Sequence, residues 1–209
     1  LLARQAATET LKAVPADSEL ARRVLIERGR ANNHLGAPQL AIADANQVLR
    51  ASPQNAAALS VRGVALIGLK QPVDARQAFQ TLRDLQPESD ALQEAMGWLG
   101  ISQVLTGDPN AAVRTLGENA QNTVGEGQTF ALAWLYVASE RQRAGQGTVA
   151  LSPHLGGQDR TSWPGVLPHF LQGAASQDEL LRMAKAEPEQ ARLRLAEAHF
   201  FIGQKLLLQ

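Results

Sequence analysis

The chain reads RRVLIERGRANNHLGAPQLAIADANQVLRASPQN from residue 22 to 55 and AAALSVRGVALIGLKQPVDARQAFQTLRDLQPES from 56 to 89. Both segments are 34 residues long and carry glycine at position 8 (Gly29, Gly63), alanine at position 20 (Ala41, Ala75) and proline at position 32 (Pro53, Pro87). Two helices of a hairpin approach closely where small residues face each other, and a proline ends the second helix. The segments therefore predict two consecutive helix hairpins, in which Ala75 touches the partner helix across Gly63.

The same spacing continues along the chain with less regularity. If Gly107 and Gly145 occupy the turn position of Gly36, two further repeats cover residues 93–126 and 131–157. Residues 159–189 then form a degenerate hairpin, residues 196–209 the first helix of a truncated repeat, and residues 1–14 a half-repeat helix. Since no stretch alternates as a strand does, the sequence predicts an all-α fold over residues 1–209, with the last hairpins degenerate.

This period and these positions resemble the tetratricopeptide repeat (TPR) family. The resemblance implies a single α-solenoid, a right-handed superhelix of helix hairpins that binds other proteins or peptides. The last third, with Trp134, Trp163-Pro164 and the segment EAHFFIGQ at 197–204, is similar to bacterial NlpI-type lipoproteins. That likeness implies a periplasmic or outer-membrane-associated adaptor that pairs with itself and brings proteases and cell-wall hydrolases together. The cytoplasm is the alternative location.

The composition argues against several classes of partner. Lys and Arg number 20 and Asp and Glu also 20, so bulk charge does not draw the chain to nucleic acid or to an anionic membrane. No apolar run approaches the roughly 20 residues that a transmembrane helix needs. We expect neither a nucleic-acid partner nor a transmembrane segment.

Residues suited to catalysis or metal binding do not form a recognisable pattern. The four histidines, His34, His154, His169 and His199, include no pair at the i, i+4 spacing of metal ligands on one helical turn, and the chain has no cysteine. Neither a Gly-x-Ser-x-Gly motif nor a phosphate-binding loop occurs. The sequence thus predicts no enzyme, no cofactor and no metal site.

The repeat register predicts a binding face, because positions 2, 5, 9 and 12 of each first helix line the concave side. The predicted partner-binding residues are Arg23, Ile26, Arg30, Asn33, Ser60, Val64, Ile67, Gly97, Ile101 and Val104. The predicted face is polar and basic on the first repeat and apolar on the second and third repeats. Such a face suits a peptide with an acidic end and a hydrophobic anchor. The alternative is that the chain itself covers this apolar face.

Three functions remain open at this point. The first is a non-catalytic scaffold that binds a partner protein or peptide in its concave groove, as a bacterial envelope adaptor would. The second is a structural spacer within a longer protein, and the third is an accessory domain of an enzyme. Since both ends resemble half-repeats, we also expect the apolar stripe of Leu195, Phe201, Leu206 and Leu208 to lack a cover and to form a homodimer through the terminal helices.

Overall fold

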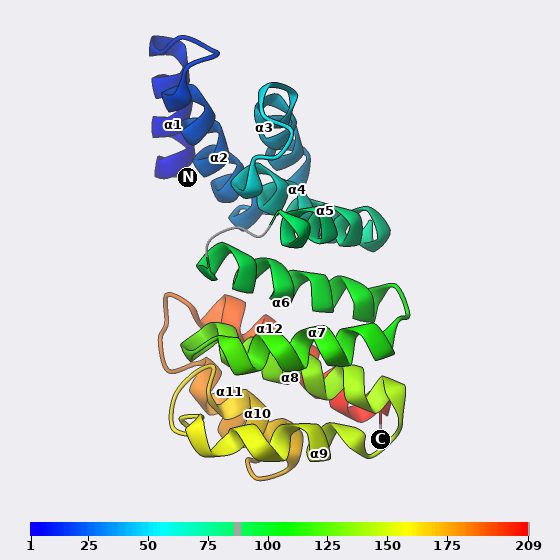
Figure 1. Ribbon diagram of the computed structural model, residues 1–209. Helices are drawn as coiled ribbons and strands as arrows, with labels where there is room; N and C mark the ends of the chain where they lie inside the picture. The colour runs from blue at the N-terminus through cyan, green and yellow to red at the C-terminus, as the bar shows by residue number, and fades with distance from the viewer. Residues whose placement is uncertain (86–88, 209) are drawn as a thin grey trace. The chain divides into compact units, whose positions relative to one another are not determined.

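The computed structural model describes residues 1–85 and 89–208, so that the predicted helix-ending Pro87 and the terminal Gln209 lie outside the described residues. Within this range every regular element is a helix, which confirms the all-α prediction (Figure 1). The elements are α1 (Leu2–Ala13), α2 (Glu19–His34), α3 (Pro38–Ala51), α4 (Ala56–Gly68), α5 (Pro72–Asp84), α6 (Ser89–Leu105), α7 (Pro109–Asn122), α8 (Gly125–Gln142), α9 (Gln146–Leu151), the 3-10 helix η1 (Ser152–Gly157), α10 (Val166–Gln172), α11 (Gln177–Ala184) and α12 (Ala191–Leu208).

Local capping explains where several of these helices begin. The side chains of Ser18, Asn55, Asp108 and Ser176 each accept a hydrogen bond from the backbone N–H three residues later, at 2.9–3.1 Å. Such caps satisfy amides that the first turn of a helix leaves without a partner. The four predicted hairpin segments each contain two helices. These pairs are α2 with α3, α4 with α5, α6 with α7 and α8 with α9.

The turns between the paired helices repeat as well. Gly36, Gly107 and Gly145 adopt positive φ angles of 69°, 76° and 80°. In the second hairpin the equivalent residue, 34 positions after Gly36, is Lys70, with φ of 59°. The left-handed conformation costs a residue with a Cβ roughly 1–2 kcal/mol, which glycine avoids.

We therefore expect Lys70→Gly to raise the free energy of unfolding by about 0.5–1 kcal/mol, because relief of the left-handed strain exceeds the entropy that glycine adds to the unfolded chain. The matched control is Gly36→Lys, which introduces the same strain at the equivalent turn and should lower stability. Urea unfolding followed by circular dichroism measures both changes. A less stable Lys70→Gly protein would contradict the assignment of the two turns as equivalent.

Contacts between residues divide the chain into two compact units, an N-terminal unit of Leu1–Ser102 and a C-terminal unit of Gln103–Gln209. The boundary falls within α6, so this helix contributes residues to both units. The right-handed superhelix over the whole chain stays a prediction.

In the N-terminal unit, helices approach each other closely at two glycines, Gly29 and Gly63. A Cβ added at Gly29 would lie 2.7 Å from Val61 Cγ1 and 3.6 Å from the carbonyl oxygen of Ala41. A Cβ at Gly63 would lie 2.5 Å from the ring of Phe79. The ring atoms of Phe79, one turn after Ala75 on α5, are therefore the nearest neighbours of such a Cβ, and the contact of Ala75 across Gly63 stays a prediction.

The C-terminal unit is built around α8, which packs against α7, α9, α10 and α12. Nine residues of α8 are buried, and Ala198, Phe201 and Ile202 of α12 belong to the same core. This packing corrects the prediction that the stripe of α12 lacks a cover. Phe201 is only 2% exposed, and Leu195 and Leu208 are partly buried against the core, whereas Leu206 is 70% exposed.

Candidate functional site

The first helices of the first three hairpins lie side by side in the N-terminal unit. Between α2 and α4, Asn33 Nδ2 donates a hydrogen bond to the carbonyl oxygen of Val61 at 3.0 Å. Between α4 and α6, Ser60 Oγ donates to Glu94 Oε1 at 3.4 Å. The predicted binding residues on α2, α4 and α6 therefore belong to three neighbouring helices.

The predicted binding residues differ in how accessible they are. Arg23 and Arg30 are exposed, whereas Asn33, Ser60, Val64, Ile67, Gly97 and Ile101 are half-buried. Two others are buried and do not offer a free surface. Ile26 packs with Leu25 and Ala41 in the core of the N-terminal unit, and Val104, 1% exposed, belongs to the core of the C-terminal unit. Asn33 is set aside because its amide is bonded to the carbonyl oxygen of Val61. We call the other accessible residues the inner row, which consists of Arg23, Arg30, Ser60, Val64, Ile67, Gly97 and Ile101.

The inner row has a basic part and an apolar part. Arg23 and Arg30 are seven residues apart on α2, so that they lie on one side of the helix about 10 Å apart. Arg30 Nη1 is 2.9 Å from Glu27 Oε1, and the structure shows no ion pair for Arg23 within the described residues. Val64 and Ile67 on α4 pack beside the cluster that contains Phe79 and Leu99.

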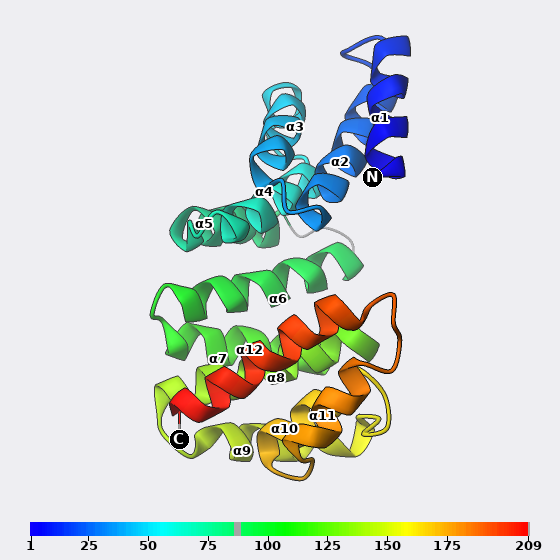
Figure 2. The same ribbon diagram turned by 180° about the vertical axis from the view of Figure 1, so that it is seen from behind.

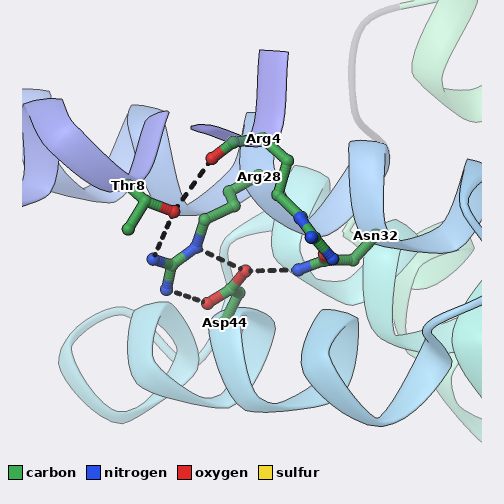
Figure 3. A network of polar contacts seen from close by, with 5 residues as sticks. All are labelled: Arg4, Thr8, Arg28, Asn32 and Asp44. Atoms are coloured by element: carbon green, nitrogen blue, oxygen red, sulfur yellow. Dashed lines mark hydrogen bonds and ion pairs between the residues drawn. The ribbon is translucent and has the colours of Figure 1, made fainter. Parts of the chain in front are cut away.

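A polar network that the sequence did not reveal joins α1, α2 and α3 (Figure 3). The buried carboxylate of Asp44 accepts hydrogen bonds from Arg28 Nε at 3.0 Å, Arg28 Nη2 at 2.5 Å and Asn32 Nδ2 at 3.1 Å. Arg28 Nη1 donates to Thr8 Oγ1 at 3.5 Å, and Thr8 Oγ1 donates to the carbonyl oxygen of Arg4 at 2.9 Å. The hydrogen bonds to Asp44 and its charge raise the pKa of Arg28. The guanidinium of Arg28 and the carboxylate of Asp44 are paired with each other, so the network positions α1, α2 and α3.

Two carboxylates of the C-terminal unit have shifted pKa values for different reasons. Asp159 accepts hydrogen bonds from Ser162 Oγ, Thr161 Oγ1 and Thr161 N at 2.7–2.8 Å, and these lower its pKa to about 2. Burial, and then the charge of Glu126, raise the pKa of Glu197. The first carboxylate stabilises a tight turn before α10, and the second lies at the contact between α8 and α12.

The described part of the chain offers neither a metal centre nor a membrane span. Residues 1–85 and 89–208 contain no group of three or more His, Cys, Asp or Glu side chains that could hold a metal ion. Among the described helices, none is long and apolar enough to cross a membrane.

Comparison with protein-family models and with curated protein sequences gives no match. The likeness to tetratricopeptide repeats and to NlpI-type lipoproteins therefore stays a prediction. The inner row is the candidate site of the N-terminal unit.

Proposed function

We propose that the chain is a non-catalytic scaffold that binds a partner protein or peptide along the inner row of the N-terminal unit. The observation that carries this proposal is the row itself, in which two exposed arginines and several half-buried apolar side chains lie on three adjacent helices. A surface of this kind supplies both charge recognition and apolar contact area.

The chemistry of the inner row defines the partner. The guanidinium groups of Arg23 and Arg30 favour carboxylates, which can accept two parallel hydrogen bonds from one arginine. Val64, Ile67 and Ile101 favour an aliphatic or aromatic anchor. The best partner is a segment with acidic residues at one end and a large apolar side chain several residues away.

We further propose that the hairpins are tetratricopeptide repeats and that the protein is a bacterial envelope adaptor, located in the periplasm or at the outer membrane. The equivalent turns at Gly36, Lys70, Gly107 and Gly145 support the repeat assignment. The segment 197–204 and Trp134, which pack together in the C-terminal unit, carry the likeness to the NlpI-type proteins.

The alternative is that the chain serves as a spacer or as an accessory domain without a ligand of its own. The packing of Val64 and Ile67 beside the core cluster favours this alternative, because part of their apolar surface is already covered within the unit. Variants at the exposed arginines separate the two functions, because these side chains contribute little to the core.

We expect the double variant Arg23→Glu, Arg30→Glu to bind the partner at least roughly tenfold more weakly, with an unchanged melting temperature. The measurement is affinity capture from bacterial envelope extract with the intact protein, followed by titration of the captured partner. The matched controls are Arg50→Glu, an exposed arginine on α3, and Val73→Asp, an exposed apolar residue on α5. Equal capture by all variants would exclude the inner row as the binding site and leave the spacer function.

A further inference from the structure

An exposed carboxylate, that of Glu94 on α6, lies at one end of the inner row. Glu94 is three residues before Gly97 and seven before Ile101, so these residues share one side of the helix. Glu94 Oε1 accepts a hydrogen bond from Ser60 Oγ at 3.4 Å, which places the carboxylate beside α4. In the part of the chain that the structure describes, Glu94 forms no ion pair. Its charge is therefore available to a bound partner.

The two ends of this surface carry opposite charges. In both views α4 lies between α2 and α6 (Figures 1 and 2). The order across the three helices is therefore basic at Arg23 and Arg30, apolar at Val64 and acidic at Glu94. Arg30 is paired with Glu27, but the two side chains are 49% and 65% exposed, and an exposed pair of this kind is weak enough to exchange for a partner's carboxylate.

We propose that the inner row together with Glu94 selects an extended segment that carries an acidic, an apolar and a basic residue in this order across the helices. This inference rests on the proposed binding function and adds a basic residue to the partner. The acidic residue would pair with Arg30, the apolar residue would pack on Val64, and the basic residue would pair with Glu94. The partner segment is thus balanced in charge.

The spacing of the helices sets the spacing of these three residues. The contacts of Asn33 with Val61 and of Ser60 with Glu94 show that each step is between directly packed helices. Axes of packed helices are about 8–10 Å apart, and an extended chain advances roughly 3.3 Å per residue. One step therefore corresponds to about three residues, so the acidic and the basic residue each lie about three residues from the apolar one, on opposite sides.

Glu94 also excludes partners. A segment that is acidic along its whole length would place negative charge against Glu94, and like charges in contact are unfavourable. A specificity of this kind comes from repulsion of the wrong partner as well as attraction of the right one. Glu94 is therefore a specificity-determining residue of the inner row, and reversing its charge should reverse the preference.

The first test is selection of a phage-displayed library of random twelve-residue peptides on the whole chain at low salt, where exposed charges are screened least. We expect the enriched peptides to carry the acidic, apolar and basic residues about three positions apart, in either chain direction. On Glu94→Lys an acidic residue should replace the basic one. Asp74→Lys, at an exposed carboxylate on α5 of the same unit, is the matched control and should select the wild-type pattern. Peptides without a basic residue, or the same peptides on Glu94→Lys, would overturn the proposal.

The second test uses two synthetic peptides that differ at one position. Both carry two Asp and one Leu at every third residue, with Ser between them, and the next third residue is Lys in one peptide and Glu in the other. By fluorescence anisotropy, wild-type protein should bind the Lys peptide at least roughly fivefold more tightly, and Glu94→Lys should prefer the Glu peptide. Since Glu94 is exposed, its variant should keep the wild-type melting temperature.

The outcomes separate this inference from the proposed function. Equal affinity for the two peptides, lost in the variant Arg23→Glu, Arg30→Glu, would overturn the role of Glu94 and leave the inner row as a binding site for acidic segments. Binding of neither peptide by the wild-type protein would overturn the proposed segment and would also count against the proposed function.

Discussion

Replacing Asp44 by alanine is expected to lower the free energy of unfolding by about 3 kcal/mol, the lower end of the range for breaking a buried ion pair. The change would remove three hydrogen-bond acceptor contacts at once and leave the guanidinium of Arg28, whose side chain is only 24% exposed, without its counter-charge. An unpaired charge away from bulk water costs more than the pair contributes when intact. Urea unfolding at neutral pH measures the effect.

Two matched variants show whether the ion pair is the cause. Glu27→Ala removes the exposed ion pair of Glu27 with Arg30 on the same helix, and exposed pairs contribute at most about 1 kcal/mol. Arg28→Met in the Asp44→Ala background removes the unpaired charge and should recover part of the lost stability. If Asp44→Ala costs no more than Glu27→Ala, the network does not stabilise the first hairpin.

The hairpins could be predicted from the sequence because their signals are local. A capping side chain, a proline at the first helical position or a glycine at a turn acts within a few residues of the place where it stands. The network of Arg28 and Asp44 gave no such signal. Although Arg28 recurs as Arg62, the residue 34 positions after Asp44 is Ala78, so the pair of Arg28 with Asp44 does not recur with the repeat.

The packing of α12 could not be predicted for a different reason. Its repeat register pointed to Phe201 as an uncovered side chain, because the next helix of a regular array would cover it. In the structure Phe201 instead contacts Trp134, with ring centroids 5.9 Å apart, across a separation of 67 residues. Residues 159–189 do not follow the repeat, and spacing rules carry no information about where an irregular segment brings the chain back.

The candidate site could be predicted from the sequence only in part. The register placed the candidate residues on α2, α4 and α6, and the contacts of Asn33 with Val61 and of Ser60 with Glu94 join these helices. It did not distinguish an accessible position from a buried one, because burial depends on the neighbour that packs against each helix. Ile26 and Val104 occupy register positions equivalent to accessible ones and yet belong to the two cores.

The close contact of Gly63 with Phe79 should make position 63 intolerant of a methyl group. We expect Gly63→Ala to lower the free energy of unfolding by about 2 kcal/mol, because the new methyl group would lie 2.5–2.8 Å from three ring atoms of a fully buried phenylalanine. This loss exceeds the gain of up to about 1 kcal/mol that alanine brings in the interior of a helix. Thermal and urea unfolding of the two proteins measure the difference.

Gly117→Ala is the control for Gly63→Ala, since Gly117 also lies within a helix, but a Cβ added there would have no described atom within 4 Å beyond its chain neighbours and the nearby backbone of its own helix. It should be neutral or stabilising. Phe79→Leu should be destabilising alone, because it removes buried ring atoms, but it makes room for the methyl group at position 63. The double variant Gly63→Ala, Phe79→Leu should therefore be more stable than the sum of the two single losses predicts. Strict additivity would mean that another residue, such as Ala75, forms the contact that limits position 63.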